Sequence, residues 1–168
     1  MRGPRVRVQI LLIITVSVLA LVACRTDLRA GAPKPGTETL QTQEVPVEGG
    51  GSYTDVNAAG LATMLEKKDF LLINVHIPYE GEIEETDLFI PYNEIEHNLD
   101  MLPTDKDSKL VLYCRSGGMS TIAARTLVKL GYTDVWNLDG GMIAWEQAGY
   151  PLVDKSRQEG IVLPQVRS

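Results

Sequence analysis

The segment around Cys114 combines a nucleophile with a backbone that could hold an anion. A short apolar run at residues 109–113 leads directly into Cys114, and Gly117 and Gly118 follow within four residues. The thiolate is the nucleophilic form of cysteine, and glycines let the chain curl so that successive N–H groups point inward. A helix that begins just after the loop adds the positive field of its N-terminus, which favours the thiolate and a bound anion. The segment therefore predicts a cysteine nucleophile in a backbone anion cradle.

The elements that must position this loop alternate along the chain. Four short apolar runs are typical of buried strands: residues 70–75, 88–90, 109–113 and 135–138. Four segments are predicted as helices: residues 58–68, 92–101, 120–130 and 142–148. This alternation indicates an α/β domain around a parallel sheet. Ligand sites of such sheets lie at the carboxyl ends of strands, which is where Cys114 is expected.

The N-terminal segment resembles the signal peptide of a bacterial lipoprotein. Basic residues precede an apolar run at residues 10–23, which is short for a membrane span and suits the core of a signal peptide. Residues 21–24, Leu-Val-Ala-Cys, are similar to a lipobox, whose cysteine receives a diacylglyceryl group. The alternatives are an uncleaved anchor or a plain signal peptide with an incidental cysteine. We expect a signal peptide at residues 1–23 and a lipid on Cys24 that holds the protein on a membrane of the cell envelope, outside the cytoplasm.

Composition divides the remaining chain into three parts. Residues 24–52 begin with the lipidated cysteine and are rich in proline, glycine, threonine and glutamine without an apolar period, which predicts a flexible tether. Residues 53–153 carry the strand and helix patterns and are expected to fold as one domain. Residues 154–168 form a polar C-terminal tail without a functional signal.

Charge and residue usage exclude several classes of function. The formal net charge is -6. The charged residues lost with the signal peptide are all basic, so the mature chain is more acidic still, and a nucleic-acid partner is not expected. The only histidines are His76 and His97. They are far apart in sequence and have no pair of cysteines near them, so no metal site is expected. The acidic residues between positions 80 and 87 lack a defined ligand loop and are interpreted as a solvated loop rather than a cation site.

Two motifs carry a family resemblance. Cys114, Gly117 and Ser120 match the active-site loop of rhodanese-like domains, which has glycine three residues after the cysteine and serine or threonine after a usual arginine. The stretch that follows the last strand also resembles the C-terminal signature of that family, through Gly140, Gly141, Trp145 and Pro151. The resemblance covers essentially all of residues 53–153. It implies a small rhodanese-like α/β domain with a parallel sheet and helices on both faces.

The resemblance also implies a reaction. In this family the cysteine takes sulfane sulfur from a donor such as thiosulfate and passes it on from a persulfide, with no metal or organic cofactor. By resemblance Cys114 is the nucleophile, and its substrate-binding cradle consists of the six residues that follow: Arg115, Ser116, Gly117, Gly118, Met119 and Ser120. The partners it implies are a small donor (persulfide, polysulfide or thiosulfate) and a thiol acceptor. The sequence names no protein partner.

The chain departs from the family pattern at three places. Met119 stands where the loop usually has arginine, although Arg115 could replace that charge. Residues 74–76, Asn-Val-His, stand where the family usually has aspartate, any residue and arginine, and residues 81–85 replace a turn that often contains histidine. The fold should tolerate these changes. We expect weak use of thiosulfate, with persulfides or polysulfides preferred.

Three alternatives stand beside the leading hypothesis of an extracytoplasmic sulfurtransferase that works through a Cys114 persulfide. One is a weakly catalytic or non-catalytic module that carries sulfur, senses thiols or docks on a protein. A second is a phosphatase, but that chemistry needs arginine six residues after the cysteine, where this chain has Ser120. The third is a buried structural thiol, which is common among cysteines.

Overall fold

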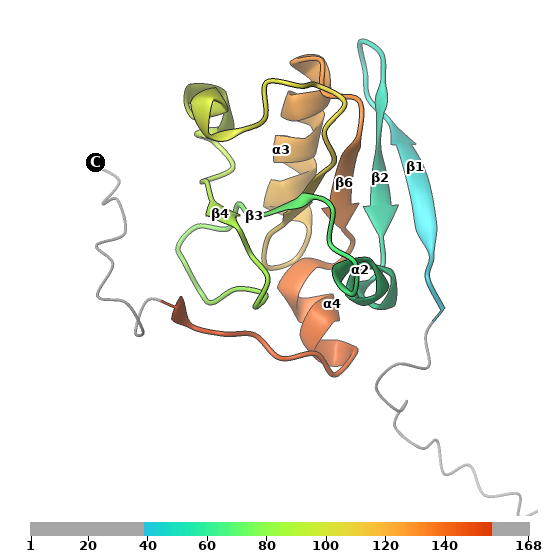
Figure 1. Ribbon diagram of the computed structural model, residues 1–168, viewed down its shortest axis with the longest axis vertical. Helices are drawn as coiled ribbons and strands as arrows, with labels where there is room; N and C mark the ends of the chain where they lie inside the picture. The colour runs from blue at the N-terminus through green and yellow to red at the C-terminus, as the bar shows by residue number, and fades with distance from the viewer. Residues whose placement is uncertain (1–38, 156–168) are drawn as a thin grey trace, which may run out of the picture. The chain divides into compact units, whose positions relative to one another are not determined.

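A six-stranded, mostly parallel sheet forms the centre of the computed structural model, which describes residues 39–155 (Figure 1). The strand order is β1-β2-β6-β5-β3-β4. The strands are β1 (Thr42–Pro46), β2 (Ser52–Val56), β3 (Leu71–Asn74), β4 (Leu88–Phe89), β5 (Leu110–Tyr113) and β6 (Val135–Leu138). Only the β1–β2 pair is antiparallel among these strands, and the other neighbours are parallel. The predicted α/β fold is confirmed.

Helices cover both faces of the sheet. They are α2 (Ala58–Leu65), α3 (Gly118–Lys129) and α4 (Gly141–Gln147), with short 3-10 helices η1 (Ile95–His97) and η2 (Leu99–Met101). Strand β5 shows how the faces divide, because Leu110 and Leu112 join the apolar core under α3, whereas Val111 and Tyr113 join the core under α2 and α4. Both cores exclude water from the central strands, so the loop after β5 is built on a rigid base.

The boundary between tether and domain was predicted too late in the chain. Strand β1 lies inside the predicted tether, where it pairs with β2 from Thr42 opposite Val56 to Pro46 opposite Ser52. Its sequence gives little apolar signal because it is an edge strand, exposed along most of its length. The prediction of a flexible tether is therefore wrong for β1. The predicted signal peptide, Cys24 and the rest of the tether up to residue 38 lie outside the described residues, as does the tail from residue 156.

The helix predicted at residues 92–101 is also wrong. The chain forms η1 and η2 instead, and Asn98 interrupts them with φ -120° and ψ 32°. The amide of Asn98 donates to the carbonyl of Glu94 at 2.8 Å, and such local side-chain bonds compete with helical pairing. Within residues 39–155, no helix is long and apolar enough to span a membrane.

Candidate active site

The loop after β5 places the Cys114 thiol at the start of helix α3. Cys114 is 2% exposed, and its Sγ accepts the Gly117 N–H at 3.1 Å. The Ser120 hydroxyl lies 3.5 Å from the same sulfur and 3.1 Å from the Gly117 carbonyl oxygen. The structure thus brings Cys114, Gly117 and Ser120 together, as the sequence predicted. The N–H groups at the start of a helix and the hydroxyl favour negative charge on this sulfur or on an atom bound to it.

Gly117 determines the shape of this loop. Its φ of +91° and ψ of -21° lie in the left-handed region, which a glycine adopts without steric cost. The turn lets α3 begin at Gly118, two residues earlier than the predicted start at residue 120, so the helix N-terminus is adjacent to the sulfur. Ser116 and Gly118 are exposed on the rim of the loop. Their predicted roles in binding remain predictions.

Met119 lies in the first turn of α3 and is in contact with the apolar core. Its side chain is half-buried and packs against the apolar core that also contains Cys114 and the buried face of α3. A thioether offers a polarisable apolar surface and no charge. The position that usually carries arginine in the family therefore supplies no cation here.

The double glycine after β6 lets helix α4 support the Cys114 loop. The first N–H groups of α4 donate to loop carbonyls: Met142 to Cys114 at 2.9 Å and Ile143 to Arg115 at 3.0 Å. A Cβ on Gly141 would overlap the Cys114 carbonyl oxygen and lie 2.8 Å from the Arg115 carbonyl carbon. The sequence predicted a tight turn at these glycines before the last helix. The contact between α4 and the Cys114 loop was missed, because it joins segments that are distant in sequence.

Replacing Gly141 with alanine is expected to destabilise the fold and the loop together. Gly141 has φ +58°, and the added methyl group can be accommodated only if the Cys114 backbone moves. We expect Gly141→Ala to lower the free energy of unfolding by about 2–4 kcal/mol in urea denaturation. The matched control is Gly131→Ala, because Gly131 has φ +92° but no neighbouring atom within 4 Å of the place that a Cβ would occupy. In the control we expect the free energy of unfolding to fall by about 1–2 kcal/mol, which is the cost of positive φ alone. Equal losses of stability in the two variants would contradict the proposed contact between Gly141 and the Cys114 backbone.

The Arg115 guanidinium is engaged by a carboxylate. Its Nη1 donates to Glu80 Oε2 at 2.8 Å, and the Nε2 atom of His76 lies 3.4 Å from that same oxygen. His76 is 7% exposed, and neither of its ring nitrogens has a partner with hydrogen-bond geometry among residues 39–155. Arg115 itself is about half exposed. The sequence indicated that Arg115 could supply the missing charge of the loop, and the structure shows that charge paired.

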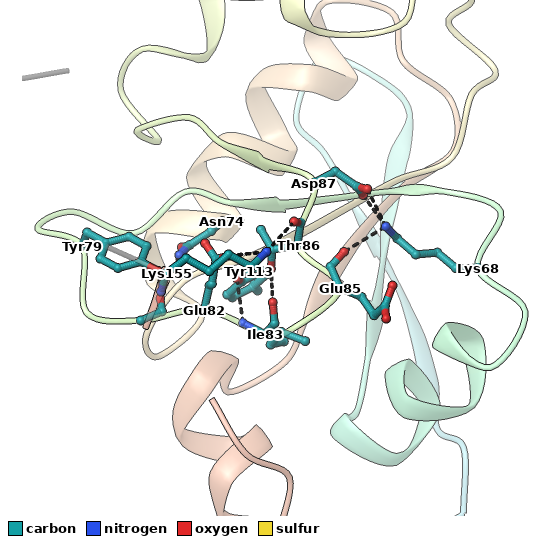
Figure 2. A network of polar contacts seen from close by, with 11 residues as sticks. Lys68, Asn74, Tyr79, Glu82, Ile83, Glu85, Thr86, Asp87, Tyr113 and Lys155 are labelled. Atoms are coloured by element: carbon teal, nitrogen blue, oxygen red, sulfur yellow. Dashed lines mark hydrogen bonds and ion pairs between the residues drawn. The ribbon is translucent and has the colours of Figure 1, made fainter. Parts of the chain in front are cut away.

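Polar contacts hold the segment between β3 and β4, and Figure 2 shows part of this network, including Asn74, Glu82 and Tyr113. The amide of Asn74 donates to the Gly81 carbonyl at 3.1 Å and accepts the His76 N–H at 3.0 Å. The Tyr113 hydroxyl accepts the Ile83 N–H at 3.1 Å. Burial raises the pKa of Tyr113 far above its ordinary value, so the hydroxyl stays protonated.

The predicted solvated acidic loop is wrong for one of its members. The Glu82 side chain is buried, and its carboxylate lies 2.7 Å from Lys155 Nζ. The backbone of Glu82 also pairs with Val153 in an isolated bridge, which ties the loop to the end of the described chain. Asp87 is paired as well, with Lys68 at 2.6 Å (Figure 2). Across residues 39–155, no group of three or more histidine, cysteine, aspartate or glutamate side chains is arranged to hold a metal ion.

Comparison with known proteins assigns the chain to a family. Residues 58–148, more than half of the chain, match the family model of the rhodanese-like domain. The chain belongs to the rhodanese-like family. Among solved structures, this rhodanese-like chain is similar to a rhodanese-related protein from Thermoplasma volcanium, with a TM-score of 0.51, 28% identity, and coverage of 59% of this chain and 96% of that one. It is also similar to a rhodanese-like domain protein from Staphylococcus aureus, with a TM-score of 0.50, 27% identity, and coverage of 60% and 98%.

Two curated relatives show how the domain is used elsewhere. A sulfurtransferase from Allochromatium vinosum is 36% identical over 103 residues, which are 59% of this rhodanese-like chain and 94% of the relative. A tRNA uridine(34) hydroxylase from Escherichia coli is 30% identical over 112 residues, which are 63% of this chain. The match spans only 30% of the hydroxylase, so the similarity concerns one part of that larger protein.

Proposed function

We propose that this rhodanese-like protein is a sulfurtransferase that handles sulfane sulfur as a persulfide on Cys114. The observation that carries the proposal is the Gly117 N–H 3.1 Å from Cys114 Sγ, at the N-terminus of α3. A persulfide places a second sulfur beyond the first one, and this outer sulfur carries a negative charge when it is ionised. Backbone N–H groups at a helix N-terminus stabilise such an anion. The similarity to the sulfurtransferase from A. vinosum supports the same activity.

The reaction has two balanced steps. In the first, the Cys114 thiolate attacks the outer sulfur of a donor persulfide, R–S–SH. The donor S–S bond breaks, a new S–S bond forms on Cys114, and the thiolate R–S⁻ leaves. In the second, an acceptor thiolate attacks the outer sulfur of the Cys114 persulfide, becomes a persulfide and regenerates the Cys114 thiolate. Thiosulfate would enter the same first step with sulfite as its leaving group.

The charges around the loop favour donors of low charge. Thiosulfate is a dianion, whereas Met119 supplies no cation and the Arg115 guanidinium is paired with Glu80. Backbone N–H groups can stabilise one negative charge, but a second one needs a charged partner when it leaves water. We therefore assign persulfides or polysulfides as the donors and a thiol as the acceptor.

The mass of the Cys114 peptide tests the proposed function. Trypsin cleaves after Lys109 and Arg115, so residues 110–115 leave as one peptide with a single cysteine. Purified full-length protein is incubated with cysteine persulfide, polysulfide or thiosulfate, alkylated and digested. One added sulfur on this peptide, removed again by an excess of a small thiol, is the expected result. A Cys114 peptide that never gains sulfur from any donor overturns the proposal.

A second candidate is a carrier or docking module that accepts one sulfur without efficient turnover. The observation that favours it is the absence of a free cation in the loop, because Arg115 is already paired. The two candidates differ in stoichiometry. A sulfurtransferase releases many persulfide equivalents per chain to a thiol acceptor, whereas a carrier stops at one until its partner is present.

We also propose that the protein is anchored outside the cytoplasm by a lipid on Cys24. The lipobox-like residues 21–24 support this proposal. Native protein is expected to partition into detergent with an acyl mass on Cys24, and Cys24→Ala is expected to be released or left unprocessed. Acyl chains hold stably because each buried CH₂ contributes about 0.8 kcal/mol. Recovery of native protein with an unmodified Cys24 would contradict the anchor.

A further inference from the structure

Glu80 is paired with the one cation of the Cys114 loop. Residues 114–120 contain one basic residue, Arg115, and the Glu80 carboxylate accepts its Nη1–H at 2.8 Å. The two residues are separated by 35 positions in sequence, so the pair is a tertiary contact between the segments after β3 and β5. Because the two opposite charges lie close together, their fields largely cancel at larger distances. An anion that approaches Cys114 therefore meets a neutral pair instead of a free guanidinium.

The carboxylate is held at this place by its surroundings. The backbone next to it is fixed on the C-terminal side, where the Gly81 carbonyl accepts from Asn74 at 3.1 Å and the Glu82 N–H donates to Val153 at 2.8 Å. Figure 2 shows Asn74, Tyr79 and Glu82 within the network that holds this segment. On the other side of the carboxylate, the buried ring of His76 comes within 3.4 Å of the same oxygen. The Glu80 side chain is 40% exposed, and its carboxylate lies at the surface between Arg115 and the buried His76 ring.

We infer that Glu80 is a specificity-determining residue, which disfavours dianionic sulfur donors by holding Arg115 in an ion pair. The inference rests on the proposed function and extends it to donor selection. A guanidinium released from Glu80 could donate charge-assisted hydrogen bonds to a sulfonate or sulfate-like oxygen. A donor of low charge gains little from that release. Glu80 would thereby slow the reaction of dianionic donors with Cys114 without slowing the reaction of donors of low charge.

The test replaces Glu80 with glutamine in the full chain. Glu80→Gln keeps the size of the side chain and removes its charge. The second-order rate constant for loading Cys114 from thiosulfate should rise about tenfold at physiological ionic strength. The rate constant with cysteine persulfide should change by less than about twofold. The matched control is Asp69→Asn, which removes one charge from an exposed pair with Lys109 at the other end of β3 and should leave both rates unchanged.

A second substitution shows whether Glu80 acts through Arg115. In an Arg115→Gln background, Glu80→Gln should raise thiosulfate loading by no more than about twofold, which is the effect of a screened, exposed charge. A full tenfold effect in that background would overturn the role of the ion pair. It would show that the Glu80 charge acts on the donor directly.

An alkylation ratio separates this inference from the proposed function. Iodoacetate is anionic and iodoacetamide is neutral, so the ratio of their rates at Cys114 reports the charge of the loop without any sulfur transfer. Glu80→Gln should raise this ratio about threefold, and Asp69→Asn should leave it unchanged. If Cys114 takes up sulfur but neither the donor preference nor the alkylation ratio responds to Glu80→Gln, the inference fails and the proposed function stands. If no donor loads Cys114 in any variant, the proposed function fails, and the alkylation ratio alone decides whether Glu80 controls anion access.

Discussion

Cys114→Ser is expected to abolish sulfur uptake from every donor, with a loss of at least about a thousandfold in rate. A serine hydroxyl is almost fully protonated at neutral pH and cannot form a persulfide. The substitution is nearly isosteric, so the Gly117 N–H can still donate to an oxygen at this position, as it donates to Cys114 Sγ at 3.1 Å. The loss should therefore reflect chemistry rather than unfolding. The measurement is the sulfur added to the protein, together with persulfide formed on the acceptor thiol.

The other cysteine provides the control for this experiment. Cys24→Ser removes a thiol outside the described domain and should leave sulfur uptake unchanged. Melting curves of the two variants should agree with each other to within a few degrees. Sulfur that stays bound to the Cys114→Ser protein would show that a different group is the acceptor, and the assignment of Cys114 as the nucleophile would be wrong.

The sequence predicted the elements whose signal is local and apolar. The run predicted at residues 109–113 contains β5 (Leu110–Tyr113), which is buried on both faces because a central parallel strand must be apolar throughout. The turn at Gly117 was predictable because a strand, two glycines and a helical pattern follow one another directly. Edge strand β1 was missed for the opposite reason, since an exposed strand is stabilised by backbone pairing and leaves no apolar alternation in the sequence.

The contacts that shape the site chemically were not predictable from local patterns. Glu80 and Arg115 lie 35 residues apart, and charged residues in a loop give no sign of their partners. Gly141 was recognised as part of a turn, but only the fold reveals that its missing side chain makes room for the Cys114 carbonyl. Glu82 belongs to an acidic run that is typical of a solvated loop, and its burial beside Lys155 depends on the end of the domain returning to this loop.

Met119→Arg is expected to raise kcat/KM for thiosulfate about ten- to a hundredfold. The gain corresponds to one charge-assisted hydrogen bond of about 1.5–3 kcal/mol between the new guanidinium and the dianion. Met119 lies in the first turn of α3 and packs partly against the core that contains Cys114. An arginine can keep its methylene stem on that surface while its charged end reaches the solvent over the loop. Steady-state kinetics with thiosulfate and cyanide measure the effect.

The neutral variant Met119→Gln separates charge from packing. Glutamine disturbs the same apolar contact without adding a cation, so it should share any loss of stability and show no gain with thiosulfate. Cysteine persulfide should be used by both variants at nearly the wild-type rate, because a donor of low charge does not need the guanidinium. Efficient thiosulfate turnover by the wild type, unchanged in Met119→Arg, would show that Arg115 or the backbone N–H groups already suffice. In that case the pairing of Arg115 with Glu80 does not limit the use of thiosulfate, and Glu80→Gln would have little further effect.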